Sequence, residues 1–286
     1  MANELVRNLI NAGVHFGHSA SRWNPKMKPY IYARRSSIHI IDVRETLKGI
    51  ILAKKLLSDI VSKGKDVVFV GTKRQAHKPV KAAAEAAGMH YITTRWLGGS
   101  LTNFRTIHSR IQRLEELELM VEDGSIESES KKRASTLKRE LRKIKANLEG
   151  IRNLKQIPGV IIVVDARKES LALREARKMG VPTIAIIDTD SDPDLVDLAI
   201  PANDDSVKAI ELITDELVAA IVEGKTMYKT IAKEAEPVRK PRLRRRSIAR
   251  AASKEEPAQN ADAPSQAVAE AEPPTEPDQT PQAAQS

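Results

Sequence analysis

Three continuous apolar runs constrain the fold of this 286-residue chain more than any other feature of its sequence. They are DVVFVGT (66–72), GVIIVVD (159–165) and VPTIAIID (181–188). Each run has the length of a β-strand and lacks the polar alternation of a half-buried strand, which predicts strands buried on both faces. Helical stretches lie between the strands, and strands that alternate with helices form a parallel sheet covered by helices on both faces. The sequence therefore predicts an α/β fold.

Weaker signals supply the remaining elements. An amphipathic helix opens the chain, and IYARRSSIHIIDV (31–43) is typical of two short strands around a basic turn at 34–37. Thr46 is expected to cap a helix that runs to Gly64. Further strands are expected at 90–93 and 198–201, and further helices at 74–87, 168–179 and 205–222.

Residues 105–150 break the alternation of strands and helices. Their apolar residues step by three, four or seven positions on either side of an EDGS turn at 122–125. This spacing predicts two long antiparallel helices with a narrow apolar seam and charged outer faces, whose charge serves solubility more often than function. The seam is expected to contain Ile107, Ile111, Leu114, Val121, Leu137, Leu141, Ile144 and Leu148.

The chain therefore divides into three parts. The α/β domain is discontinuous and comprises residues 1–104 and 151–224, with a helical hairpin inserted at 105–150. Residues 225–286 form a tail that is first basic and then rich in Pro, Ala and Glu. Because the tail lacks the apolar residues needed to offset the entropy of ordering, we expect it to be disordered.

The distribution of charge points to a polyanionic partner. The chain carries a net charge of +9, but residues 251–286 carry one lysine against seven acids, so the first 250 residues carry +15. A chain this basic over its first 250 residues favours nucleic acid or, less often, an anionic membrane surface. Only 3% of the residues are aromatic, which favours contacts with phosphates and sugars over the stacking of many single-stranded bases.

Two absences exclude other classes of protein. The chain has no cysteine, which excludes a disulfide framework, a thiolate zinc site and a cysteine nucleophile, and which fits a reducing cytosol. No apolar run approaches the roughly 18 residues needed to span a bilayer. We therefore expect neither a secreted scaffold nor a membrane protein.

The segment HFGHSASRWNPKMKPY (15–30) is the first candidate site. It combines cations, aromatic rings and two prolines without an acid, and it has neither a helical nor a strand period. Pro25 and Pro29 argue against a continuous helix or a central strand, so we expect an irregular, rigid loop. Such a loop suits folded nucleic acid, because cations meet phosphates and rings lie on sugars or bases. The alternative is a surface loop whose Trp23 belongs to the core.

VGTKRQA (70–76) is a weak candidate for a phosphate-binding turn. It follows a strand and opens a helix, but it matches neither the P-loop nor the dinucleotide-binding motif. Lys73 and Arg74 could nevertheless hold an anion at the start of the helix.

WLGGSLTNF (96–104) does not match the nucleophile elbow of hydrolases. No glycine stands two positions after Ser100, where that motif requires one. Gly98 and Gly99 are instead expected to form a tight turn at which the backbone approaches a partner.

DTDSDPD (188–194) resembles a calcium loop only at its start. With Asp188 as the first position, Pro193 stands where glycine is required and Ala199 where a bidentate glutamate is required. Asp205 is expected to cap the last helix or to complement its dipole.

A structural cation is a weaker expectation for the same part of the chain. Carboxylates together with imidazole suit a hard cation or zinc. The alternative is that the histidines only form hydrogen bonds with nearby backbone. The candidate ligands are the acids Asp188, Asp204 and Asp205, with His15 or His18.

Three classes of function remain on these residues. A nucleic-acid-binding protein explains the basic body and the segment at 15–30. A nucleotide- or sugar-phosphate-binding enzyme would need convergent titrating groups in one concave site, and no motif supplies them. An interaction scaffold would explain the hairpin but not the charge.

Long and unusual motifs follow one another along residues 5–224. They are AGVHFGH, RWNPKMKPYI, IHIIDVRET, FVGTKRQA, RWLGGSLTNF, VIIVVDARKE, VPTIAIIDTD and DPDLVDLAIPANDDS. Together they resemble the small-subunit ribosomal protein S-two family, in its bacterial and organellar branch. The resemblance implies a flavodoxin-like three-layer α/β sandwich with a parallel sheet, an inserted antiparallel coiled-coil hairpin, and a structural role in rRNA binding without catalysis.

The resemblance also points to residues of the RNA interface, to which Lys73, Arg74 and Arg105 are added. The sequence departs from the family at Ser36 and Ser37, where Asn-Gly is common, and at Ala202, which replaces a glycine. The expected RNA-binding residues are Arg22, Trp23, Asn24, Lys26, Lys28, Tyr30, Arg34, Arg35, Lys73, Arg74, Arg95, Trp96, Gly98, Gly99, Asn103 and Arg105.

The resemblance further implies partners and a location. The chain would lie at the head–body junction of the small subunit, on rRNA and beside other ribosomal proteins, including the large mRNA-recruiting one of bacteria. No catalytic residue, small-molecule substrate or cofactor is expected, apart from the structural cation. The location would be the cytoplasmic ribosome, and an organellar ribosome stays open. The alternative is the same fold acting as a scaffold away from the ribosome.

Overall fold

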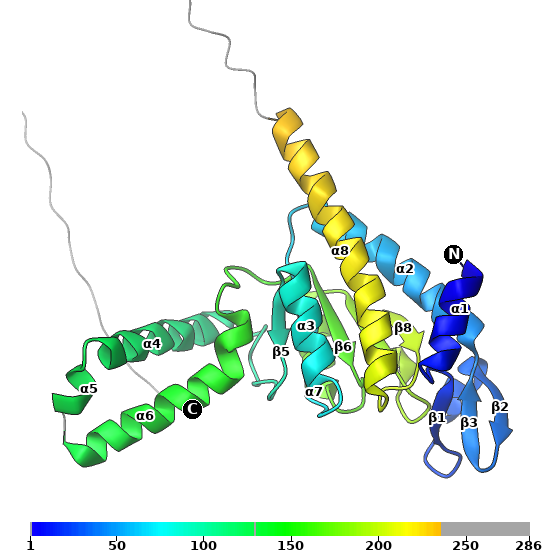
Figure 1. The fold of residues 1–286 in the computed structure, drawn as a ribbon, viewed down its shortest axis with the longest axis horizontal. Helices are drawn as coiled ribbons and strands as arrows, with labels where there is room; N and C mark the ends of the chain where they lie inside the picture. Colours follow the sequence, from blue (N-terminus) through cyan, green and yellow to red (C-terminus); the bar gives the residue numbers. More distant parts are fainter. Residues whose placement is uncertain (1, 129, 236–286) are drawn as a thin grey trace, which may run out of the picture. The chain divides into compact units, whose positions relative to one another are not determined.

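A five-stranded parallel sheet carries the fold of the computed structural model, which describes residues 2–128 and 130–235 (Figure 1). The strands lie in the order β5-β4-β6-β7-β8, and every neighbouring pair is parallel. Numbered within the sheet this order is 2-1-3-4-5, which is the flavodoxin-like order. The predicted α/β class is confirmed. The strands are β4 (Val67–Val70), β5 (His90–Ile92), β6 (Val160–Val164), β7 (Thr183–Ile187) and β8 (Leu198–Pro201).

Helices cover both faces of this sheet. Val67 and Phe69 of β4 point into one core, whereas Val68 and Val70 point into the other. The complete burial of β4, β6 and β7 explains why their sequences are continuously apolar. The first core is closed by α1 (Ala2–Asn11), α2 (Val43–Val61), α3 (His77–Ala87) and α8 (Val207–Ala235), and the second by α7 (Ser170–Met179) and the base of the hairpin.

The end of α3 agrees with the prediction, whereas the start of α2 does not. Gly88 ends α3 in the left-handed conformation, as its position predicts. The N-cap of α2 is Asp42, whose carboxylate accepts the backbone N–H of Arg44, and not Thr46 as predicted. Asp42 stands directly before the first turn, so its carboxylate reaches an N–H of that turn. Thr46 lies inside the helix, and its buried hydroxyl donates to the carbonyl of Pro201.

The segment at 15–30 is more regular than the sequence predicts. Part of it is an edge strand of a small antiparallel sheet of order β1-β3-β2, and part is the 3₁₀ helix η1. Both prolines lie within η1, because a short 3₁₀ helix needs few N–H donors and Pro25 stands at its first position. The elements are β1 (Phe16–Ser19), η1 (Pro25–Tyr30), β2 (Ile31–Arg35) and β3 (Ile38–Ile41).

The basic turn between β2 and β3 is confirmed. Arg35 pairs with Ile38, so the loop has two residues, Ser36 and Ser37. Both serines have positive φ, +47° and +67°. This is the turn for which Asn-Gly is preferred, so the two serines hold a strained conformation.

The helical hairpin is also present, with a corrected seam. Leu117 is buried on α4, whereas Val121 is 45% exposed near the end of the helix. A short helix after the turn buries Ile126 in its place, which the sequence did not predict. The coiled-coil packing stays a prediction. The elements are α4 (Phe104–Glu122), α5 (Ser125–Ser128), α6 (Lys131–Leu148) and the 3₁₀ helix η2 (Glu149–Ile151).

The last helix is longer than predicted. α8 continues to Ala235, past the expected domain end at 224, because Gly224 does not stop it. A Cβ at Gly224 would lie 3.0 Å from the carbonyl oxygen of Ser58, so glycine at this position serves the close packing of α8 on α2. The basic and acidic parts of the predicted tail from residue 236 lie outside the described residues. Within the described ranges, no helix is both long and apolar enough to cross a bilayer.

Candidate nucleic-acid interface

Some of the candidate residues lie at one edge of the main sheet. Because β4 to β8 are parallel, the segments that follow them leave the sheet at the same edge. We call this the carboxyl edge. Its segments are 71–76 after β4, 93–103 after β5, 165–169 after β6, 188–194 after β7 with the 3₁₀ helix η3 (Pro193–Leu195), and 202–206 after β8.

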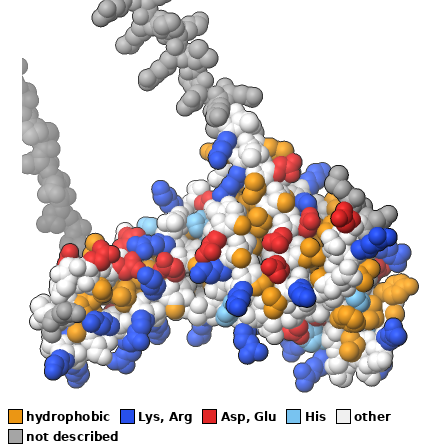
Figure 2. All heavy atoms as spheres, in the orientation of Figure 1, with side chains coloured by type: hydrophobic (Ala, Val, Ile, Leu, Met, Phe, Trp, Pro, Cys, Tyr) orange, Lys and Arg blue, Asp and Glu red, His pale blue; other side chains and the backbone are white. Residues whose placement is uncertain are grey.

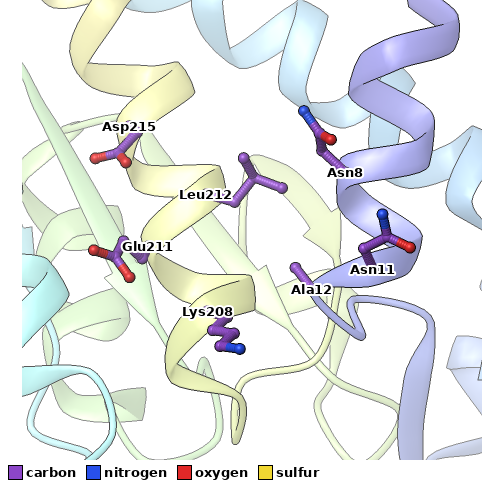
Figure 3. A pocket seen from close by; sticks show the side chains of 7 residues that line it. All are labelled: Asn8, Asn11, Ala12, Lys208, Glu211, Leu212 and Asp215. Atoms are coloured by element: carbon purple, nitrogen blue, oxygen red, sulfur yellow. The ribbon is translucent and has the colours of Figure 1, made fainter.

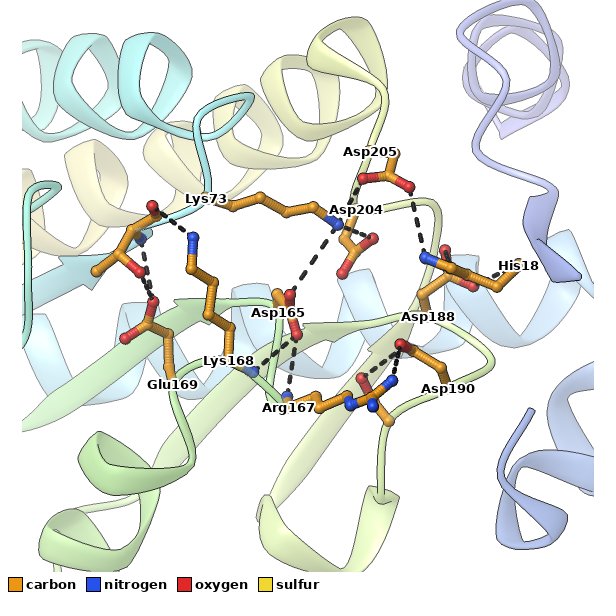
Figure 4. A network of polar contacts seen from close by, with 12 residues as sticks. His18, Lys73, Asp165, Arg167, Lys168, Glu169, Asp188, Asp190, Asp204 and Asp205 are labelled. Carbon is orange, nitrogen blue, oxygen red and sulfur yellow. Dashed lines mark hydrogen bonds and ion pairs between the residues drawn. The ribbon is translucent and has the colours of Figure 1, made fainter. Parts of the chain in front are cut away.

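Lys73 lies at the centre of a group of charged side chains on this edge, which we call the polar cluster (Figure 4). The cluster consists of Lys73, His18, Asp165, Asp188, Asp204 and Asp205. The Nζ atom of Lys73 is 2.7 Å from Asp204, 2.6 Å from Asp205 and 4.0 Å from Asp165. Burial opposes the charge of Lys73, but hydrogen bonds to Asp204 and Asp205 outweigh it and raise the pKa of Lys73 above its ordinary value. The structure thus gives Lys73 carboxylate partners within the chain, in place of the external anion that the sequence predicts.

His18 brings the N-terminal segment to the same cluster. Its Nδ1 lies 2.8 Å from Asp188 and its Nε2 lies 3.5 Å from Asp205. The hydrogen bond to Asp188 raises the pKa of His18 to about 9. Gly17 permits this approach, since a Cβ there would lie 2.6 Å from the Thr189 methyl group.

Part of this cluster fits a metal ion. Ligand atoms of His18, Asp188 and Asp204 lie within 4.8 Å of one another. The Oδ2 atom of Asp204 is buried and has no hydrogen-bond partner, and burial raises the pKa of Asp204 to about 7. His15 is not part of the group, and its ring lies 4.1 Å from the ring of Phe16 in a tilted arrangement. One histidine and two or three acids thus meet as the sequence suggested.

The loop after β8 corrects two details. Ser206 caps α8, since its hydroxyl accepts the N–H of Ala209, whereas Asp205 contacts Lys73 and His18. Ala202 is fully buried and does not have a positive φ, so alanine is accommodated where the family has glycine.

Glu169 holds the loop after β4. Its carboxylate accepts the N–H and the hydroxyl of Thr72, and Lys168 donates to the carbonyl of Thr72. Burial raises the pKa of Glu169 above its ordinary value. This arrangement leaves Arg74 exposed at the tip of the loop.

The glycine turn after β5 encloses a carboxylate of the chain itself. Gly99 has a φ of +91°, and its N–H donates to Glu175 of α7 at 2.8 Å. Trp96 is only 5% exposed, and its indole N–H also faces Glu175. Trp96 is therefore a core residue, although the sequence predicts it among the RNA-binding residues. Gly98, Arg95, Asn103 and Arg105 are exposed.

The N-terminal segment carries exposed cations in addition to those of the carboxyl edge. Lys26 is paired with Asp192 and Asp194, and Asn24 caps η1. Trp23 is half-buried with its ring 5.2 Å from His39, and Tyr30 is half-buried against the second core. The exposed cations of this segment are Arg22, Lys28, Arg34 and Arg35.

Two patches of exposed cations therefore flank the polar cluster. Among the described residues none of these side chains has an ion-pair partner, so their charge is available to an external anion. The N-terminal patch consists of Arg22, Lys28, Arg34 and Arg35, and the turn patch consists of Arg74, Arg95 and Arg105.

Sequence reasoning missed several of these residues. Tyr32 is 70% exposed beside the N-terminal patch, and the alternation of β2 could have placed it outside. Glu169 and Glu175 are buried. Glu175 lies among the buried alanines and leucine of α7 and Glu169 directly precedes that helix, and their spacing from these residues was the available signal.

A groove elsewhere on the body has the wrong charge for a polyanion. It has a volume of about 390 Å³ and lies between α1 and α8 (Figure 3). Burial and the neighbouring Glu211 and Glu216 raise the pKa of Asp215 above its ordinary value, which reflects the local concentration of acids. The residues lining it are Asn8, Asn11, Ala12, Lys208, Glu211, Leu212 and Asp215.

Comparison with known proteins agrees with this architecture. The family model for ribosomal protein S2 matches residues 9–224. The small ribosomal subunit protein uS2 of Rhodopirellula baltica is 51% identical over 232 residues, which cover 81% of this chain and 89% of that protein. The protein of the same name from Coprothermobacter proteolyticus is 50% identical over 225 residues, covering 79% of this chain and 84% of that protein. The chain belongs to the ribosomal protein S2 family.

Proposed function

We propose that this chain is a structural component of the small ribosomal subunit and that its α/β body binds small-subunit rRNA. Family membership supports the proposal, since both relatives are named as small-subunit proteins. The observation that carries it is the pair of cationic patches. They consist of exposed side chains without ion-pair partners among the described residues. The positions that the family motifs mark are Arg22, Lys28, Arg34, Arg35 and Arg95.

The phosphate contacts are assigned to the two patches and not to the polar cluster. The acids of the polar cluster would repel phosphates, so phosphate contacts fall on the flanking patches, where cations supply sequence-independent affinity. Tyr32 offers an exposed ring beside the N-terminal patch that can lie on a ribose or an unstacked base.

The proposed role includes no reaction. In flavodoxin-like folds the ligand crevice opens where the strand order reverses, here between the ends of β4 and β6. The chain fills that place with its own contacts, between Thr72 and Glu169 and between Lys73 and Asp165. Carboxylates rather than free donors face this crevice, which disfavours a phosphate-bearing substrate.

His18, Asp188 and Asp204 supply one nitrogen and carboxylate oxygens, a donor set that suits zinc or a hard divalent cation. The unpartnered buried oxygen of Asp204 favours such an ion. In the proposed role the ion is structural, because it would join the N-terminal segment to the ends of β7 and β8.

The hairpin is proposed as the contact for neighbouring ribosomal proteins, including the large mRNA-recruiting one. Leu119, Met120 and Val121 are exposed near its end, which favours a protein partner over a phosphate. Acidic side chains gather on α4 and basic ones on α6 (Figure 2), so each face suits a partner of opposite charge. This role would place the chain with cytoplasmic ribosomes.

The proposal is tested by the salt dependence of RNA binding. Filter binding of the full chain to small-subunit rRNA should weaken by about 0.7 to 0.9 log units per log unit of salt for each phosphate contact. A binding constant that does not change between about 50 mM and about 200 mM salt would contradict an interface built on phosphate contacts.

Site assignment needs a comparison between two pairs of arginines. Arg22→Ala with Arg95→Ala should reduce incorporation into reconstituted small subunits more than Arg133→Ala with Arg139→Ala on the hairpin. Both variants lose the same formal charge, so the comparison separates the patches from charge alone. Equal losses of incorporation would remove the assignment to the patches.

A further inference from the structure

Glu175 is a buried acid outside the two cationic patches. It lies in the middle of α7 and is 7% exposed. Among the described residues it has no cationic partner, which is unusual for a buried carboxylate. Its negative charge must therefore be balanced by something other than a salt bridge.

Hydrogen-bond donors of the glycine turn balance this charge. Oε1 accepts the backbone N–H of Gly99 at 2.8 Å and the indole N–H of Trp96 at 3.3 Å. Oε2 accepts the backbone N–H groups of Leu101 at 3.1 Å and Thr102 at 3.4 Å, and the Thr102 hydroxyl at 3.4 Å. Every one of these donors belongs to the segment 96–102.

The carboxylate is held in its ionised form by this arrangement. Burial opposes ionisation, but the hydrogen bonds from Gly99, Leu101, Trp96 and Thr102 outweigh it and keep the pKa of Glu175 below its ordinary value. The backbone must curl around the two oxygens for so many N–H groups to point inward. Gly99 adopts a φ of +91° at this bend, which glycine alone does readily.

The curled turn fixes the parts of the interface on both sides of it. Arg95 directly precedes Trp96, and the N–H of Asn103 bonds to the carbonyl of Gly99 at 2.8 Å. α4 then begins at Phe104 and carries Arg105 in its first turn. The spacing of Arg95 and Arg105 therefore depends on the path that the backbone takes around Glu175.

We propose that Glu175 is a positioning residue for rRNA binding, because its carboxylate orders the turn at 96–102 and thereby sets the placement of Arg95 and Arg105. The inference rests on the proposed function and assigns a specific part of it to a residue that touches no RNA. The shape of a glutamine is nearly the same as that of glutamate, but its amide N–H₂ would face N–H donors of the turn.

The test combines hydrogen exchange with RNA binding in the full chain. In Glu175→Gln the amides of 96–103 should exchange at least tenfold faster, whereas the amides of β6 should not change. The salt slope of binding to small-subunit rRNA should fall by about 0.7 to 0.9 for each phosphate that the variant chain no longer binds. Adding Arg95→Ala and Arg105→Ala to Glu175→Gln should weaken binding less than the same changes do in the wild-type chain.

Asp197→Asn is the matched control. Asp197 also accepts a backbone N–H and a hydroxyl, both from Thr183. Thr183 is the first residue of β7, so this contact lies at the end of the sheet opposite to the carboxyl edge. In this variant the backbone amides around Thr183 should exchange hydrogen faster, whereas binding to rRNA should equal that of the wild-type chain. Should Glu175→Gln fail to fold, Gly99→Ala strains the same turn with the carboxylate in place and is expected to weaken RNA binding by the same route.

The outcomes separate the inference from the proposed function. Faster exchange at 96–103 with unchanged RNA binding overturns the positioning role, and so does weaker binding with unchanged exchange. If the wild-type chain itself shows no salt-dependent binding while Arg95→Ala has no effect, the proposed function fails and the positioning role for rRNA fails with it.

Discussion

Single carboxylates determine much of the local structure at the scale of residues. Asp42, Asp165, Glu169, Glu175 and Asp197 each accept a backbone N–H from a turn, a loop, or the start of a helix or strand. An ionised acceptor forms stronger hydrogen bonds than a neutral one, so each acid fixes the path of the segment around it. Four of the five belong to connections at the ends of sheet strands, which explains why those connections are ordered.

The strained turn between β2 and β3 gives a prediction for stability. Ser36→Asn with Ser37→Gly should raise the free energy of unfolding by about 1 to 2 kcal/mol, because both positions require positive φ. Urea unfolding followed by circular dichroism measures the change. Ser21→Gly, at an exposed serine without positive φ, is the control and should not stabilise. A double variant no more stable than wild type would contradict the strain.

The proposed cation gives a second prediction for single residues. Zinc added to the metal-free chain should raise Tm, since an ion that binds only the folded state stabilises it by mass action. His18→Ala or Asp204→Ala should abolish the rise, whereas His15→Ala should keep it because His15 lies outside the cluster. Differential scanning calorimetry is the measurement. An equal rise in the His18 and His15 variants would show that the cluster does not hold the ion.

At the scale of elements, the hairpin shows how a helix period selects a seam. Ile107, Ile111, Leu114 and Leu117 of α4 are buried and follow spacings of four and three. The predicted member Val121 lies near the end of α4 and is 45% exposed. Ion pairs between side chains also hold the hairpin together: the carboxylate of Glu118 on α4 lies 2.8 Å from the ammonium of Lys145 on α6 and 2.7 Å from the guanidinium of Arg152.

The corrected seam predicts unequal effects of two truncations. Leu114→Ala should lower the free energy of unfolding by about 2 to 4 kcal/mol, because Leu114 is fully buried. Val121→Ala should change it by less than about 0.5 kcal/mol, because Val121 is largely exposed. Chemical unfolding of both variants checks the difference. A loss at Val121 as large as that at Leu114 would restore the seam that the sequence indicated.

The scale of the whole molecule is governed by the distribution of charge. The basic block 239–250 carries seven cations and no acid, and it lies outside the described residues. If this block contacts rRNA, it adds to the affinity that the two patches supply. It does not change which residues set the orientation of the folded body on the RNA.

Neutralising the basic block should therefore weaken RNA binding. Replacement of Arg242, Arg244, Arg245 and Arg246 by Gln in the full chain should lower the salt slope by about 0.7 to 0.9 for each cation that meets a phosphate. Filter binding over a range of salt concentrations measures the slope. Glu270→Gln with Glu272→Gln is the control and should not weaken binding. An unchanged slope in the arginine variant would limit the interface to the folded body.

The sequence by itself determined the architecture, because local patterns encode it. Continuous apolar runs marked β4, β6 and β7, and helical spacing marked the hairpin. Glycine at position 88 marked a helix end. These features depend on residues near one another in the chain, so one sequence suffices to read them.

Only the tertiary structure decided which candidate residues are available to a partner. Lys73 looked like an anion-binding residue, yet Asp204, which neutralises it, lies 131 positions away in the chain. Trp96 was expected among the RNA-binding residues, yet Glu175 on a distant helix holds its indole N–H in the core. Burial and charge pairing join residues far apart in the sequence, and no local pattern carries that information.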